Sequence, residues 1–324
     1  MIFIAHKIYL RNIIKDRVSM NKKLIQQCHC IITFFLILLP KVVLSSYESD
    51  AMQVMPIGNF VLAPSQRPGA LFSFGQNVID RNNILASETA ALLLGHHKRF
   101  FVNALTFLYG VTDSFSFLIT VPAPVINKED HLHASGFGDI NFQAEYEFYE
   151  KVSPTSITQA TVLGTLFLPT GVFDAIQTFE EIPQLATGLG STSFFAGTTF
   201  NRTTIEWYIY ASTGILTTLK KNNSKLGNSF LYQGGFGKNL GHFEDKILML
   251  MFEVSGITSK PNKFMGINIG NTGGTIIFAG PSVWYSTPTF IFQAGFQVPL
   301  FQKLSGIQNK TSFLCALSLT WKSR

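Results

Sequence analysis

The stretch Asp-Ile-Asn-Phe-Gln-Ala-Glu-Tyr-Glu-Phe-Tyr-Glu, residues 139–150, decides the fold class of this chain. Its side chains alternate, so that one face of an extended strand carries Ile140, Phe142, Ala144, Tyr146 and Phe148. The opposite face carries Asn141, Gln143, Glu145 and Glu147. The aromatic face suits lipid, whereas the charged face needs water. A membrane β-barrel satisfies both, because its closed sheet also pairs every backbone group that lipid cannot solvate.

Comparable segments of roughly ten residues, the length of a tilted membrane-spanning strand, recur along the chain. We therefore predict an all-β fold, a single antiparallel transmembrane β-barrel of about twelve strands. The expected strands cover residues 70–80, 98–109, 114–121, 139–150, 156–168, 190–200, 204–215, 229–240, 246–255, 275–286, 289–299 and 312–321.

The connectors between these segments are alternately long and short. Turn-sized connectors rich in Gly, Asn, Asp and Pro separate long ones near 81–97, 122–138, 169–189, 216–228, 256–274 and 300–311. Outer-membrane barrels typically have long external loops and short periplasmic turns. The pattern thus predicts that both termini of the barrel lie in the periplasm.

The composition agrees with a barrel of this kind. Hydrophobic residues make up 46% of the chain and charged residues 14%, yet no run of about 18 apolar residues could form a spanning helix. A soluble, secreted β-sandwich is the alternative, since it also alternates. The crowding of Phe, Tyr and Trp on one face of nearly every expected strand favours the membrane barrel.

Residues 1–45 are predicted to be an upstream extension followed by a secretory signal peptide. Met20-Asn21-Lys22-Lys23 forms a basic head, Cys30–Leu39 an apolar core, and cleavage is expected near Ser45. The chain starts at either Met1 or Met20. Beyond residue 45 the chain has 18 basic and 18 acidic side chains, so the net charge of +6 gives no case for a nucleic-acid partner.

Residues 46–69 are predicted to form an irregular segment ahead of the barrel, which would occupy residues 70–324. Pro56, Pro64 and Pro68 argue against a further strand, while the apolar content argues against a freely solvated tail. Two interpretations stay open. The segment folds into the barrel as a partial plug, or it packs on the periplasmic rim.

Polar residues on the face opposite the aromatics are the candidates for the lumen. They are Arg99, Asn103, Glu145, Glu147, Glu206, Tyr208, Glu253 and Gln293. Such side chains either create a field that selects solutes, or form a satisfied network that stiffens a filled barrel. Met249 and Met251 share the face of Glu253, where they line a path for an apolar molecule or pack a plugged interior.

Other chemistry is not indicated. His96-His97 and His131-x-His133, with Glu129 and Asp130, are expected to be solvated loop residues and not a metal site. The chain has no Gly-x-Ser-x-Gly, His-Glu-x-x-His or Gly-x-x-x-x-Gly-Lys motif. We predict no cofactor, no metal and no enzymatic activity.

Several motifs resemble a family of Gram-negative outer-membrane proteins named for the meta-pathway of phenol degradation. They are Tyr109-Gly110-Val111-Thr112-Asp113, Gly136-Phe137-Gly138-Asp139, Leu168-Pro169-Thr170-Gly171, Gln297-Val298-Pro299-Leu300-Phe301-Gln302 and Ser305-Gly306-Ile307-Gln308. The resemblance spans residues 109–308 in order. It implies an outer-membrane barrel that acts as a channel for hydrophobic or aromatic compounds.

The sequence thus predicts an outer-membrane channel for passive passage of small compounds. Lipid of the outer membrane is its expected partner, while the permeant and the oligomeric state stay open. Two alternatives remain: a plugged barrel that displays its external loops, and an outer-membrane hydrolase, since the fold itself excludes neither.

Overall fold

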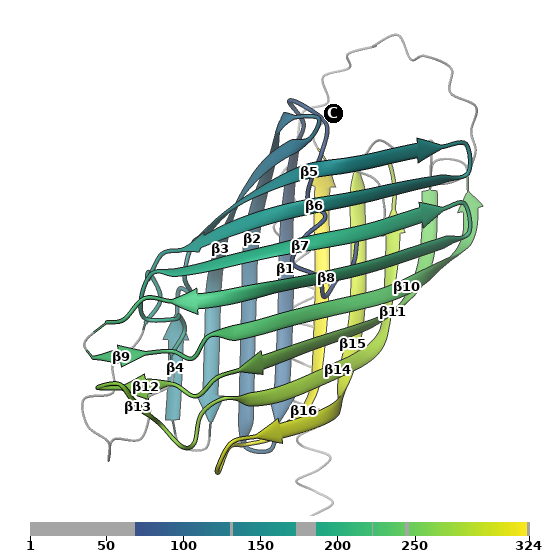
Figure 1. Ribbon diagram of the computed structural model, residues 1–324. Coiled ribbons are helices and arrows are strands. Elements are labelled where there is room, and N and C mark those ends of the chain that lie inside the picture. Colours follow the sequence, from purple (N-terminus) through teal and green to yellow (C-terminus); the bar gives the residue numbers. More distant parts are fainter. Residues whose placement is uncertain (1–68, 130–131, 173–185, 222, 244–245, 323–324) are drawn as a thin grey trace, which may run out of the picture. The chain divides into compact units, whose positions relative to one another are not determined.

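The computed structural model describes residues 69–129, 132–172, 186–221, 223–243 and 246–322, and every regular element among them is a strand (Figure 1). The described ranges hold no helix long and apolar enough to cross a membrane. Twelve long strands are β1 (Ile84–Gly95), β2 (Lys98–Thr112), β3 (Phe115–Glu129), β5 (Asn141–Ser153), β6 (Ser156–Phe167), β7 (Ser193–Thr204), β8 (Trp207–Thr218), β10 (Ser229–Phe243), β11 (Lys246–Ser259), β14 (Gly274–Ser286), β15 (Phe290–Leu304) and β16 (Thr311–Lys322). Four short strands are β4 (Leu132–Gly136), β9 (Ser224–Lys225), β12 (Lys263–Phe264) and β13 (Ile267–Asn268).

The twelve long strands close into one antiparallel barrel. Each pairs with its neighbours along the chain, and β1 pairs with β16 as well as with β2. Strand β4 extends the sheet beside the far end of β3, and β9, β12 and β13 form a small separate sheet from two connectors (Figure 1). The predicted fold class, a closed twelve-stranded barrel, is confirmed.

The alternation of side chains sorts them between the two faces of the wall as the sequence predicts. In β5, Glu145 is 1% exposed while its neighbour Tyr146 is 49% exposed. In β15, Gln297 is fully buried while Phe296 is 51% exposed. The polar set therefore faces the lumen, and the aromatic set forms the outer surface.

The first expected strand is wrong. Residues 70–80 form no strand, and β1 is Ile84–Gly95, which the sequence assigned to the first long connector. This stretch, ILASETAALLLG, is rich in Ala and Leu and has no aromatic residue, so it lacks the features by which the other strands are recognised.

The first predicted connector is therefore also wrong. It was expected to be long, but the β1–β2 hairpin is short and turns at His96-His97, whereas the ten later connections alternate short and long as predicted. We call the end of the barrel with the β2–β3, β5–β6 and β7–β8 turns the turn end, and the opposite end the loop end.

The predicted signal peptide, its cleavage site and residues 46–68 lie outside the described residues.

Candidate functional site

The lumen of the barrel is occupied by Gly69–Asp80, which we call the luminal segment (Figure 1). Its groups hydrogen-bond to inward side chains of the wall and not to a neighbouring strand. The wall residues come from six strands: Ser116 (β3), Gln143 and Glu145 (β5), Tyr208 and Ser212 (β8), Gln233 (β10), Glu253 (β11) and Gln293 (β15). Strands β5 and β11 lie on opposite sides of the strand order, so the segment crosses the bore.

Glu253 holds one part of the luminal segment. The backbone N–H of Leu71 donates to Oε1 at 3.3 Å and that of Phe72 to Oε2 at 3.1 Å. The Tyr210 hydroxyl donates to Oε2 at 2.8 Å, and the Ser282 hydroxyl donates to Oε1. The carboxylate thus bridges the wall strands β8 and β14 to two consecutive amides of the segment.

Glu145 holds another part in the same manner. The backbone N–H of Gln76 donates to Oε1 at 2.8 Å and that of Asn77 to Oε2 at 3.1 Å. The Asn77 side chain adds a bond of 3.3 Å, Thr161 one of 2.6 Å and Gln143 one of 3.4 Å. We call Glu145 and Glu253 the two carboxylate clamps.

Neither clamp is neutralised by a cation. Both carboxylates are 1% exposed or less, and among the described residues neither bonds to a lysine, arginine or histidine. Burying a carboxylate is costly unless hydrogen bonds replace its water. Four donors at Glu253 and five at Glu145 supply that replacement, and charge-assisted bonds are the stronger kind. Release of the segment would remove two donors from Glu253 and three from Glu145.

Amide side chains of the wall fix the rest of the luminal segment. Gln293 donates to the Gly69 carbonyl at 2.7 Å. At Phe74, the backbone N–H donates to Gln233 Oε1 at 3.2 Å, while Gln143 Nε2 donates to the carbonyl, also at 3.2 Å. The segment therefore has specific partners along its length, although it belongs to no sheet.

Close packing accompanies these bonds. The Phe74 ring meets Phe195 of β7 edge-on, with the centroids 4.7 Å apart. At Gly75 an added Cβ would lie 2.1 Å from Thr199 Cγ2 and 2.9 Å from Leu163 Cδ2, so only glycine fits against the wall there.

Side chains pack part of the turn end of the lumen. One cluster of buried residues comprises Tyr208, Tyr210, Ile247, Met249, Met251, Trp284 and Ile291, and Ala70 of the luminal segment packs against it. Met249 and Met251 are at most 2% exposed, so they pack a filled interior and do not line an open path.

The structure brings four of the sequence-predicted lumen residues to the luminal segment: Glu145, Tyr208, Glu253 and Gln293. Tyr208 does so through its hydroxyl, which donates to Gln76 Oε1. Glu147 lies further along β5 and accepts a bond from Gln159.

Three of the predicted residues lie elsewhere. Asn103 bonds to Glu88 at 2.9 Å, and Glu88 is opposite the exposed Leu105, so this pair is on the outer face. Glu206 is exposed in the β7–β8 turn, where the chain reverses before the alternation of β8 begins. Arg99 is near the hairpin end of β2, opposite Leu94.

The sequence-based interpretation did not include Ser116, Gln143, Ser212 and Gln233 among the site residues, although each lies on an inward face. The alternation of side chains along a strand predicts which face of the wall each of these residues lies on. It does not predict which group the residue contacts, because that group belongs to the luminal segment, far away in the sequence.

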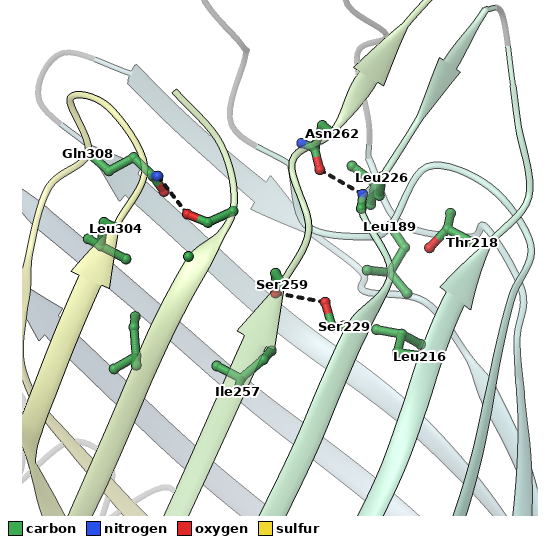
Figure 2. A pocket seen from close by; sticks show the side chains of 14 residues that line it. Leu189, Leu216, Thr218, Leu226, Ser229, Ile257, Ser259, Asn262, Leu304 and Gln308 are labelled. Carbon is green, nitrogen blue, oxygen red and sulfur yellow. Dashed lines mark hydrogen bonds between the residues drawn. The ribbon is translucent and has the colours of Figure 1, made fainter. Parts of the chain in front are cut away.

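The lumen has a cavity at each end. The loop-end cavity has a volume of about 330 Å³ and is lined by residues of β8, β10, β11, β14 and β15 and of the connectors at this end, including Leu189 of the β6–β7 connector (Figure 2). The turn-end cavity has about 160 Å³ and lies between the luminal segment and the wall formed by β1, β2, β3, β14, β15 and β16. Within the part of the chain that is described, no three His, Cys, Asp or Glu side chains gather as they would around a metal ion.

These features define a class: the fold is that of a twelve-stranded outer-membrane β-barrel with an occupied lumen. Among solved structures, the chain is similar to an outer membrane channel from Pseudomonas putida F1, at 12% identity and a TM-score of 0.61, over 78% of this chain and 99% of that one. At 12% identity, this structural similarity shows that the two proteins have the same fold and nothing more. The NanC porin is 10% identical over 74% of this chain and 100% of its own. Its TM-score is 0.46, which is too low to support a conclusion about this chain.

Neither a family model nor a curated protein matches the sequence. The resemblance to the phenol-degradation family therefore stays a prediction.

Proposed function

We propose that this protein is an outer-membrane channel through which small hydrophobic or aromatic compounds pass passively. One observation carries the proposal: the bore is narrowed by a segment that is held by side-chain hydrogen bonds and not by strand pairing. Because the wall closes through β1 and β16 without it, this segment is able to move while the barrel stays intact.

The location in the outer membrane is part of the same proposal. It is supported by the aromatic outer face, by the likeness in fold to the Pseudomonas putida channel and by the signal-like sequence before the barrel. The motifs that resemble those of the phenol-degradation family are a further reason to propose hydrophobic or aromatic permeants.

Two measurements test transport: uptake by intact cells and conductance of the purified protein in planar bilayers. Intact Gram-negative cells that express the protein are expected to take up radiolabelled toluene several-fold faster than cells with an empty vector. The purified protein is expected to give small conductance steps in planar bilayers, since the luminal segment narrows the bore. Absence of both effects, with correctly assembled protein, would contradict the channel function.

A plugged barrel that displays its loops is the second candidate. The packed cluster at the turn end, where Tyr208, Met249, Met251 and Trp284 are buried together, favours it. This function predicts neither conductance nor accelerated uptake, so the same experiment separates the two.

The orientation is tested with single cysteines in a Cys315→Ala background. Ile307 is 91% exposed in the β15–β16 connection, and Thr155 is exposed in the β5–β6 turn. With long loops outside, a membrane-impermeant maleimide is expected to label Ile307→Cys on intact cells and to label Thr155→Cys only after lysis. The reverse pattern would show the opposite orientation.

A further inference from the structure

The loop-end cavity has an unusual lining for the mouth of a polar lumen. Fourteen residues surround it, and none of them is charged or aromatic. The two carboxylate clamps lie outside this set. The cavity is therefore a neutral, aliphatic compartment inside a barrel whose lumen elsewhere carries buried carboxylates.

Four of the lining residues are aliphatic side chains of the barrel wall. Leu216, Ile257, Ile276 and Leu304 are inward residues of four different strands. Figure 2 shows Leu216, Ile257 and Leu304 side by side along this part of the wall. A pocket built on strands is held in shape by the sheet, so it is preformed before any ligand arrives.

Hydroxyl groups are placed among these side chains. Thr218 Oγ1 accepts a hydrogen bond from the Ser193 hydroxyl at 3.1 Å, and Ser229 and Ser259 form a pair. The hydroxyls of Ser229 and Ser259 lie 2.7 Å apart, and each could be the donor. Only one of their two protons is used in that bond, so the other remains to be donated to a ligand oxygen. Asn262 and Gln308, in contrast, bond to the backbone of Gly227 and Gly273 and hold the rim.

The volume limits the size of the ligand. A cavity of 330 Å³ is near the lower end of the range for small-molecule sites. At about 30 Å³ for each water-sized group, it accommodates roughly ten non-hydrogen atoms.

We propose that the loop-end cavity is a binding site for an uncharged aliphatic molecule of this size that carries one hydroxyl or carbonyl oxygen. The chain of the ligand packs on the leucine and isoleucine side chains, and its oxygen accepts a hydrogen bond from the serine pair. Charged molecules are expected to bind more weakly, because none of the fourteen lining residues carries an opposite charge to compensate the loss of their water. As a step in transport, this site rests on the proposed channel function, whereas the binding itself does not.

The test measures binding directly. The full chain, reconstituted in lipid nanodiscs with labelled isoleucine methyl groups, is titrated with 1-hexanol, hexanoate, hexylammonium and benzyl alcohol. 1-Hexanol is expected to shift the methyl signals of Ile257 and Ile276 and to leave those of Ile247 and Ile291 at the turn end unchanged. Hexanoate and hexylammonium are expected to bind at least ten-fold more weakly.

Two variants and a matched control localise the site. Ile276→Phe fills the cavity and is expected to abolish the shifts of Ile257. The double variant Ser229→Ala with Ser259→Ala removes both hydroxyls, because either serine alone would keep a proton to donate, and it is expected to weaken 1-hexanol binding roughly 2- to 10-fold. Ser318→Ala is the control, because it breaks another hydroxyl pair of the lumen, with Thr89 at 2.8 Å, outside the cavity.

Three results would overturn the proposal: no shift with 1-hexanol, equal binding of a charged analogue, or stronger binding of benzyl alcohol. Binding of 1-hexanol without transport in the uptake experiment would contradict the channel function and support the binding site. Transport without binding would support the channel function and contradict the binding site.

Discussion

Replacing both carboxylate clamps by glutamine, Glu145→Gln with Glu253→Gln, is expected to raise the single-channel conductance several-fold in an assembled barrel. Each carboxylate accepts two consecutive backbone N–H groups, one on each oxygen. A glutamine side chain has one acceptor oxygen, and its NH₂ group would face the second N–H as donor against donor.

The magnitude follows from the bonds lost. A buried donor left without an acceptor costs about 1–3 kcal/mol, and each 1.4 kcal/mol is roughly a tenfold change in an equilibrium. The ratio of docked to released luminal segment is thus expected to fall by about tenfold or more for each substitution. Since the wall closes without the segment, the barrel itself is expected to stay assembled.

Conductance in planar bilayers checks this result, and deletion of residues 70–78 sets the upper limit for an open bore. Glu129→Gln is the matched control, because that carboxylate lies at the loop end of β3, where it accepts a bond from Asn309. An unchanged conductance in the double variant, together with a raised one in the deletion, would mean that the clamps do not hold the segment. If neither changed, the luminal segment would have no gating role.

The second large effect concerns the outer face. Phe252→Arg is expected to destabilise the barrel by about 2–4 kcal/mol, the cost of a cation near the bilayer midplane. Phe252 is central in β11, is 42% exposed, and its ring lies 6.1 Å from that of Phe236 on β10.

Unfolding of the reconstituted protein in urea gives the free energy for comparison. Trp207→Arg is the control, since Trp207 is the first residue of β8 and lies at the turn end, where the cost falls to about 0–1 kcal/mol. Equal destabilisation by both substitutions would show that Phe252 is not deep in the lipid.

Local pattern was sufficient to predict most of the wall. In a strand, successive side chains point to opposite faces whatever the rest of the chain does, so the alternation in residues 139–150 already places Glu145 inside and Tyr146 outside. The same reasoning fails for Ile84–Gly95, where small and aliphatic side chains on both faces erase the contrast.

The function of the inward carboxylates could not be predicted from the alternation of side chains. Sequence placed Glu145 and Glu253 on the inner face but left a solute-selecting field and a satisfied network as equal alternatives. Their partners turned out to be backbone amides 68 to 182 positions away, in a stretch that had been assigned to the first strand.

The sequence by itself therefore determined the barrel, its closure into a membrane-type wall and the division of its side chains between lipid and lumen, because these depend on a period of two along the chain. Tertiary structure alone decided what occupies the lumen. The luminal segment, the two carboxylate clamps and the loop-end cavity all depend on groups that meet across the bore, and the order of residues along one strand carries no record of what lies opposite.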